Sequence, residues 1–144
     1  MGGYVRYMRL LSIFLVAAGF ACQDPMAARV GQEFTLTLGE QVRIADANLT
    51  IGFHNVPSDS RCPINAMCVW AGNAVVVLGV HQGPPDARPP DLQVILNTFL
   101  DPRAAPIDGY VLQLIKLAPD PVAGQPRQKP YRATLRLVPD GASP

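Results

Sequence analysis

The segment NAVVVLGV, residues 73–80, is almost entirely apolar and rich in β-branched side chains. Such residues favour strands, and an apolar run without polar alternation is typical of a strand that is covered on both faces. The segment therefore predicts a central strand, buried on both faces, around which a β-sheet domain is built.

Six further segments around this strand also have strand character. Phe34, Leu36 and Leu38 alternate with Thr35 and Thr37, which is the period of two expected of a half-buried strand. The segments predicted as strands on this basis are 33–38, 41–45, 49–56, 91–99, 110–118 and 131–138.

The connections between these segments are rich in proline. Twelve of the 15 prolines follow residue 83, mostly in the connections 83–91 and 119–130, where they end strands and discourage pairing at sheet edges. No helical periodicity extends over ten residues outside 10–21. The chain is therefore expected to form one all-β domain over 33–139, an antiparallel β-sandwich of about seven strands and Ig-like type, or a small barrel. The tail 140–144 is expected to be disordered.

The N-terminus has the features of a secretory signal peptide. Residues 10–21 (LLSIFLVAAGFA) are apolar and follow Arg6 and Arg9, and the run is too short to cross a bilayer permanently. We expect a signal peptide over 1–21, with Met1 or Met8 as its start, and a tether over 22–32.

Cys22 is a candidate for lipidation. The preceding Gly19-Phe20-Ala21 suits ordinary signal peptidase and partly matches a bacterial lipobox. The chain has three cysteines, so a pair between Cys62 and Cys68 would leave Cys22 as an odd thiol, which lipidation would consume. The sequence thus predicts a lipoprotein, with a soluble periplasmic or secreted protein as the alternative. Gln23 after the anchor favours the outer membrane, facing the periplasm.

The charge balance excludes one class of partner. Without Arg6 and Arg9 the chain keeps 10 of its 12 basic residues against 11 acidic ones, and no block of like charge exceeds two residues. Nucleic-acid binding needs clustered Lys and Arg, so no nucleic-acid partner is expected. Contact with a membrane is expected only through an anchor at Cys22.

The cysteine segment DSRCPINAMCVWAGN, residues 59–73, carries the most distinctive pattern. Five residues separate Cys62 from Cys68, unlike the two of redox motifs, and no second pair suggests zinc, so a small disulfide loop is expected. Trp70, just before the central strand, is expected to pack in the core beside the disulfide. Its alternative role is in a binding loop with Asp59 and Arg61.

Catalysis is not expected at this segment. Ser60 would need a histidine base, but His54 and His81 lie on predicted strands, and Ser60 lacks the glycine-flanked elbow of hydrolases. We expect Asp59 to cap loop donors and Arg61 to pair with an acid or with carbonyls. Copper bound by the two histidines with Met67 or Met26 remains an alternative. Otherwise no metal site, cofactor or catalytic residue is predicted.

The run Asp59-Ser60-Arg61-Cys62-Pro63, followed by Cys68-x-Trp70-x-Gly72, resembles a group of uncharacterised bacterial exported proteins and lipoproteins with this signature. The resemblance covers residues 33–80 and implies an exported β-domain. Together with the missing catalytic set, these features predict a non-enzymatic binding or structural module of the cell envelope, with a protein or peptide partner. A periplasmic copper carrier or a small protease inhibitor is the alternative function.

Overall fold

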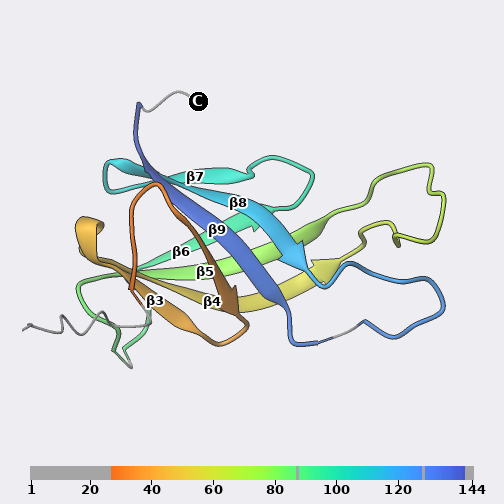
Figure 1. Ribbon diagram of the computed structural model, residues 1–144, viewed down its shortest axis with the longest axis horizontal. Helices are drawn as coiled ribbons and strands as arrows, with labels where there is room; N and C mark the ends of the chain where they lie inside the picture. Colours follow the sequence, from red (N-terminus) through yellow and green to blue (C-terminus); the bar gives the residue numbers. More distant parts are fainter. Residues whose placement is uncertain (1–26, 87, 128, 142–144) are drawn as a thin grey trace, which may run out of the picture.

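A computed structural model describes residues 27–86, 88–127 and 129–141. Two sheets pack face to face and do not close into a barrel, which confirms the predicted β-sandwich (Figure 1). Apart from a single 3₁₀ turn, η1 (Ala45–Ala47), the described segments form strands and loops. None of the described residues forms a helix long and apolar enough to cross a membrane.

The first sheet has five strands in the order β1-β3-β4-β5-β6, and the second has four in the order β2-β9-β8-β7. All neighbours pair antiparallel except β1 and β3, which are parallel. The first sheet comprises β1 (Ala27–Ala28), β3 (Gln41–Ile44), β4 (Leu49–Asp59), β5 (Ala74–Gln82) and β6 (Leu92–Asn97). The second comprises β2 (Glu33–Thr37), β7 (Ala104–Ile107), β8 (Tyr110–Ala118) and β9 (Arg132–Pro139).

Each of the predicted strands is present, and two short strands were not predicted. The strand β7 lies in a segment that we expected to be a loop, and Asp108-Gly109 connects it to β8, with both residues at positive φ. An Asp-Gly pair is a strong hairpin signal, but β7 itself contains Pro106 and is too short to show alternation. The strand β1 lies within the expected tether.

The predictions for the two chain ends fall largely outside the described residues. The signal peptide over 1–21, its start at Met1 or Met8, and Cys22 are among them. The described part of the expected tether, 27–32, is folded onto the domain, because Ala28 is buried and the N–H of Gly31 donates to the carbonyl of Leu137. At the other end, the N–H of Asp140 donates to the carbonyl of Gly109.

The central strand β5 is buried on its inner face from Ala74 to Val80, but on its outer face only at one end. Val75 and Val77 are half-buried on the outer face, whereas Gly79 and His81 are buried there. A Cβ at Gly79 would lie 2.5 Å from Cε1 of His54 and 2.9 Å from Cβ of Pro90. The proline-rich connection 83–91 therefore covers the sheet only at this end, and the prediction of burial on both faces is wrong for the other half.

The core lies between the two sheets and draws on both. Phe53, the largest fully buried side chain among the described residues, belongs to β4 and to a core cluster of apolar side chains from both sheets. Other fully buried members are Ile44, Ile51, Ala74, Val76, Leu78, Leu96, Leu112, Ala133, Leu135 and Leu137. Thr50, which is also buried, donates its hydroxyl to the carbonyl of Gly83 at 2.6 Å.

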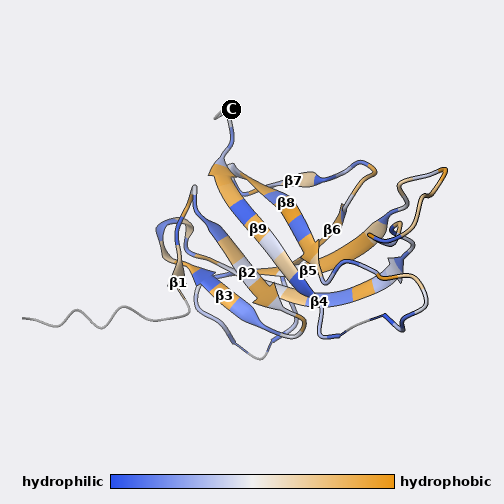
Figure 2. Ribbon diagram, turned by 45° about the vertical axis from the view of Figure 1, so that its right-hand side comes forward, coloured by the Kyte–Doolittle hydropathy of each residue, from blue (hydrophilic) through white to orange (hydrophobic). Residues whose placement is uncertain are grey.

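The two ends of β4 mark opposite ends of the molecule. Ala28 of β1 pairs with Ile44, which pairs with Leu49 at the start of β4, so the chain enters the domain there. The cysteine loop, residues 60–73, leaves from the other end of β4, after Asp59 (Figure 2). Eleven strand residues span about 33 Å at the usual rise per residue. Two register shifts interrupt the β4–β5 pairing beyond Phe53.

Replacing Phe53 by alanine should test the core. Because Phe53 is 0 % exposed, Phe53→Ala should lower the free energy of unfolding by about 3–5 kcal/mol in urea titrations. Phe99→Ala is the matched control, since Phe99 is 62 % exposed, and it should change stability by less than about 0.5 kcal/mol. Equal losses in the two variants would contradict this assignment of the core.

Candidate functional site

The cysteine loop begins as a continuation of the β4–β5 ladder. The N–H of Ser60 donates to the carbonyl of Asn73 at 2.7 Å, and the N–H of Cys62 donates to the carbonyl of Ala71 at 2.9 Å. The predicted disulfide between Cys62 and Cys68 is present, with the two Cα atoms 6.0 Å apart. Ladder and disulfide together fix the base of the loop.

Gly72 allows the two arms of this base to approach each other. Its φ is +71°, and a Cβ at this position would lie 1.9 Å from the backbone oxygen of Ser60. Only glycine combines this conformation with so close a backbone contact. The glycine of the cysteine signature thus has a definite structural role.

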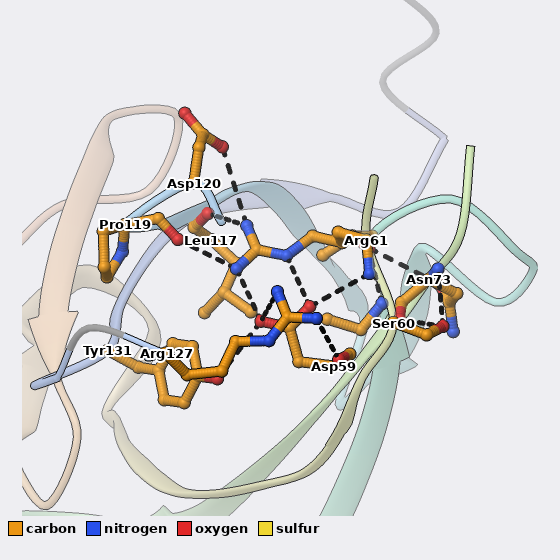
Figure 3. Close-up of polar contacts among 11 residues, drawn as sticks. Asp59, Ser60, Arg61, Asn73, Leu117, Pro119, Asp120, Arg127 and Tyr131 are labelled. Carbon is orange, nitrogen blue, oxygen red and sulfur yellow. Dashed lines mark hydrogen bonds and ion pairs between the residues drawn. The ribbon is translucent and has the colours of Figure 1, made fainter. Parts of the chain in front are cut away.

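Asp59 and Arg61 form a paired, nearly buried unit at the same base (Figure 3). The guanidinium donates from Nε to Oδ1 at 2.9 Å and from Nη2 to Oδ2 at 2.8 Å, a two-point contact. The side chains of Asp59 and Arg61 are only 5 % and 12 % exposed. The predicted capping role is present as well, since the N–H of Arg61 donates to Asp59 Oδ1.

Arg61 also joins the two sheets. Its guanidinium donates to the carbonyls of Leu117 and Pro119, at and just beyond the end of β8, and Nη1 lies 3.6 Å from Oδ1 of Asp120. The base of the cysteine loop, in the first sheet, is thereby fastened to the second sheet.

Two more side chains complete the surroundings of Asp59. The hydroxyl of Tyr131, just before β9, donates to Oδ2 at 3.1 Å. Arg127 donates to the backbone carbonyl of Asp59 at 2.8 Å and places Nη1 3.6 Å from Oδ2. The connection 119–130 therefore contacts the cysteine loop through this carboxylate.

The environment shifts two pKa values in opposite directions. Burial alone would raise the pKa of the Asp59 carboxyl, but the hydrogen bonds from Arg61 and the charges of Arg61 and Arg127 outweigh burial and lower it. Burial, and then the negative charge of Asp59, raise the pKa of the Tyr131 hydroxyl. The site therefore holds an ionised aspartate and a neutral tyrosine at ordinary pH.

Two of the three residues proposed for a binding loop are engaged within the protein. Asp59 and Arg61 use their charged groups on each other and on neighbouring backbone. Ser60 is similarly engaged, because its hydroxyl donates to the carbonyl of Asn73 at 3.0 Å. Asp59 and Arg61 therefore support the loop rather than present charge to a ligand.

The prediction that Trp70 packs in the core is wrong, since its side chain is 82 % exposed. The ladder of Ser60 and Asn73 carries the loop past the end of the sandwich, where the opposite sheet no longer covers it. Other large apolar side chains of the loop are also exposed: Ile64 (72 %), Met67 (103 %) and Val69 (91 %).

A second exposed apolar segment lies beside the loop. Asn73 accepts hydrogen bonds at its side-chain oxygen from the N–H groups of Phe99 (3.0 Å) and Leu100 (3.3 Å), between β6 and β7. Trp70, Phe99 and Leu100 line a shared hollow of about 240 Å³. We call the six exposed side chains of the two segments the apolar tip: Ile64, Met67, Val69, Trp70, Phe99 and Leu100.

Sequence reasoning missed the partners of the loop. Tyr131 was seen only as a strand residue and Arg127 only as part of a connection. Both lie about 70 positions from Asp59 and meet it only in the fold. One signal in the sequence was available: the predicted buried strand 73–80 begins with a polar residue, Asn73. Its side chain accepts the hydrogen bonds that hold the segment containing Phe99 and Leu100.

The structure does not bring Met67 to the two histidines. His54 leans over Gly79 on the face of the first sheet that also carries His81, whereas Met67 belongs to the apolar tip. Met26 lies outside the described residues. Over 27–86, 88–127 and 129–141, no group of three or more His, Cys, Asp or Glu side chains is arranged to hold a metal ion.

Comparisons with known proteins give no functional indication for this chain. No protein-family model, no curated protein and no solved structure matches the chain. The geometry provides two features for functional inference. One is the set of side chains around Asp59, namely Arg61, Arg127 and Tyr131, which together with Asp59 we call the clamp. The other is the apolar tip.

Acid should destabilise the protein through Asp59. The unfolded aspartate titrates near pH 3.9 and the folded one lower, so the stabilisation is present above pH ~4 and is lost as the pH falls through the folded pKa. In urea titrations between about pH 6 and pH 2, Asp59→Asn should flatten the pH dependence of the unfolding free energy. Tyr131→Phe, which removes one hydrogen bond to Oδ2, should flatten it less.

Asp46→Asn is the control for this experiment, because Asp46 is exposed on η1, next to the opposite end of β4 from Asp59. It should keep the wild-type pH dependence. If the unfolding free energy of Asp59→Asn depends on pH as steeply as that of wild type, Asp59 is not the carboxylate responsible for the loss of stability in acid.

Gly72→Ala should disrupt the base of the loop. The added Cβ meets the Ser60 carbonyl and strains the backbone, so we expect a loss of at least about 2 kcal/mol in unfolding free energy. Gly124→Ala is matched, since Gly124 has φ +80° but nothing within 4 Å of the new Cβ. A loss no larger than that of Gly124→Ala would show that the close contact is relieved cheaply.

Proposed function

We propose that this protein is a non-enzymatic binding module of the bacterial cell envelope, which captures a protein or peptide partner through the apolar tip. The observation that carries the proposal is the exposure of Trp70, Met67 and Val69 on a loop whose base is tightly held. Leaving large apolar groups in water is unfavourable, and a cluster of them marks an interaction surface.

The tip has the composition of an interface centre. Residues 62–73 and 98–100 contain no charged side chain, while Asp101, Arg103 and Lys116 lie close by in the sequence or at the same end of the fold. Interfaces combine an uncharged, aromatic-rich centre with a polar rim. The hollow beside Trp70, about 240 Å³, has room for one large apolar side chain of a partner.

The ordered base of the cysteine loop reduces the conformational entropy that the loop would lose when a partner binds. The disulfide, the Ser60–Asn73 ladder and the Asp59–Arg61 pair order the base of the loop before any partner arrives. Pre-ordered loops lose less conformational freedom on binding. Asp59 and Arg61 thus contribute to binding indirectly, as positioning residues.

The position of the chain entry favours a protein partner over the anchoring membrane. β1 lies at the Leu49 end of β4, about 33 Å from the start of the cysteine loop. The five Cα–Cα steps from Cys22 to Ala27 reach at most about 18 Å. An anchor at Cys22 would therefore attach the domain to its membrane at the end opposite the apolar tip.

The envelope location rests on the sequence and the disulfide. Disulfides persist in oxidising compartments such as the periplasm, and the Cys62–Cys68 bond is consistent with an extracytoplasmic protein. The signal-peptide pattern, the lipidation of Cys22 and outer-membrane anchoring are part of the proposal. The partner could be a protease, in which case the protein would act as the small protease inhibitor named above as an alternative function.

Trp70 provides a direct test because it is the single tryptophan. Peptides would be selected on the purified protein from a random display library, with Trp70→Ser used for counter-selection. We expect the selected peptides to share one large apolar residue and to shift the Trp70 fluorescence to the blue. In calorimetry, Trp70→Ser and Phe99→Ala should weaken binding at least tenfold.

Ile95→Ser is the matched control, because Ile95 is half-exposed on β6 and outside the tip, and it should bind within about twofold of wild type. Phosphatidylethanolamine–phosphatidylglycerol vesicles are the second probe. A blue shift with vesicles, together with no selected peptide that depends on Trp70, would overturn the proposal in favour of membrane insertion.

A further inference from the structure

The strand β6 is an edge of the first sheet, and nothing in its sequence hinders the addition of another strand. An exposed edge presents unpaired backbone groups, which proteins usually protect with charged residues, proline, bulges or very short strands. Leu92–Asn97 has six residues, contains neither a charged residue nor a proline, and pairs with β5 without a register shift. The free side of β6 is therefore open to pairing.

The other sheet edges within the described ranges are protected. β1 has two residues, and β7 has four, one of which is Pro106. β2 begins with the charged Glu33, and the N–H of Thr37 at its other end donates to the side chain of Glu40 at 2.7 Å. The part of β4 that β3 leaves unpaired is interrupted by two register shifts. This contrast makes β6 the edge best suited to strand addition.

The free backbone groups of β6 are placed symmetrically about Val94. The N–H of Asn97 points away from β5 and donates to the carbonyl of Pro102 at 2.9 Å. Because alternate residues of an antiparallel strand bond to the same side, the N–H and carbonyl groups of Gln93 and Ile95 also face away from β5. These groups have no partner within the part of the chain that the structure describes.

Exposed apolar side chains gather on the same strand. Outside the apolar tip, three large apolar side chains of the described residues are exposed: Leu92 (46 %), Ile95 (50 %) and Ile115 (37 %). Two of these three belong to β6. A strand added at this edge would cover them, so side chains and backbone both favour pairing here.

We propose that two copies of this chain associate by antiparallel pairing of their β6 strands about a two-fold axis at Val94. In this register Gln93 of one copy lies opposite Ile95 of the other, so the free N–H and carbonyl groups of both residues become paired in both copies. The two Ile95 side chains become diagonal neighbours on the outer face, within reach of each other. Leu92 lies opposite Leu96 of the other copy.

Symmetry and charge favour a second copy as the added strand. A two-fold interface is self-complementary, and the free groups of Gln93 and Ile95 already have that arrangement about Val94. Like charges brought together would oppose self-pairing, but the nearest acidic residue, Asp91, comes opposite Asn97 rather than opposite itself. Asp91 is also ion-paired within its own chain, at 3.5 Å. The pairing therefore introduces no like-charge contact along the strand.

This interface does not include the apolar tip, so the two proposals stand or fall separately. The segment that follows β6 carries Phe99 and Leu100 of the tip. Because the two β6 strands run in opposite directions, the two tips lie at opposite ends of the dimer.

Sedimentation velocity tests the proposal on the purified protein carrying Cys22→Ser, which prevents both lipidation and an intermolecular disulfide. Between about 10 μM and about 1 mM we expect a reversible change from monomer to dimer, as for a small interface. Ile95→Lys should weaken association at least about tenfold, because two like charges meet across the axis. Ile115→Lys is the matched control on β8 and should dimerise as wild type.

A second pair of measurements tests the register. Gln93→Glu combined with Ile95→Lys should restore association, because the two substituted positions face each other with opposite charges. Hydrogen exchange at the N–H groups of Gln93 and Ile95 should slow as the protein concentration rises. Exchange at Asn97, whose N–H is already bonded to Pro102, should stay unchanged.

Circular dichroism checks that each variant folds, and Gln93→Lys, at an exposed position, is a second disruptive variant. A monomer at all concentrations, or association that survives both Ile95→Lys and Gln93→Lys, would overturn the proposal. Association that is lost in Trp70→Ser but kept in Ile95→Lys would assign self-association to the apolar tip instead.

Discussion

The paired charges of Asp59 and Arg61 are the contact on which this end of the structure depends. The aspartate ends the longest strand of the first sheet, and the arginine reaches the carbonyls at the end of β8 in the second sheet. Other hydrogen bonds support this bridge: Tyr131 donates to Asp59, the N–H of Ile64 donates to the carbonyl of Pro121, and the N–H of Ala123 donates to the side-chain oxygen of Asn65. Removing one partner would leave a nearly buried charge uncompensated, which is strongly destabilising.

The Asp59–Arg61 pair also fixes the direction of the chain where it leaves β4. A buried ion pair is costly to desolvate, and an apolar pair of similar volume often stabilises as well. What an apolar pair lacks is direction. The two-point contact, the backbone carbonyls and the Tyr131 hydroxyl together fix one orientation of the chain as it leaves β4. Because Trp70 and Met67 lie on the loop that starts there, the direction of the chain also sets where their exposed side chains lie.

Local patterns in the sequence were sufficient for seven of the nine described strands and for the disulfide. Alternation identified β2 and β9, the apolar run identified β5, and the spacing of the cysteine pair identified the disulfide between Cys62 and Cys68. The exposure of Trp70 was not predictable in the same way, because it depends on where the sandwich ends relative to the loop. The convergence of Tyr131 and Arg127 on Asp59 depends on the packing of segments distant in sequence. The Asp108-Gly109 pair was a readable hairpin signal that the weak pattern of β7 obscured.

The interrupted pairing of β4 bears on how another chain could approach the apolar tip. β3 pairs with β4 only as far as Gly52, so the second half of β4 forms a sheet edge among the described strands. That edge contains Pro57 and the two register shifts, which deprive it of the regular row of backbone donors and acceptors that an added strand requires. Extension of the sheet, a common mode of peptide capture, is therefore disfavoured next to the tip. Selectivity at this end must come from side chains, and self-association through strand addition at this edge is suppressed by the same feature.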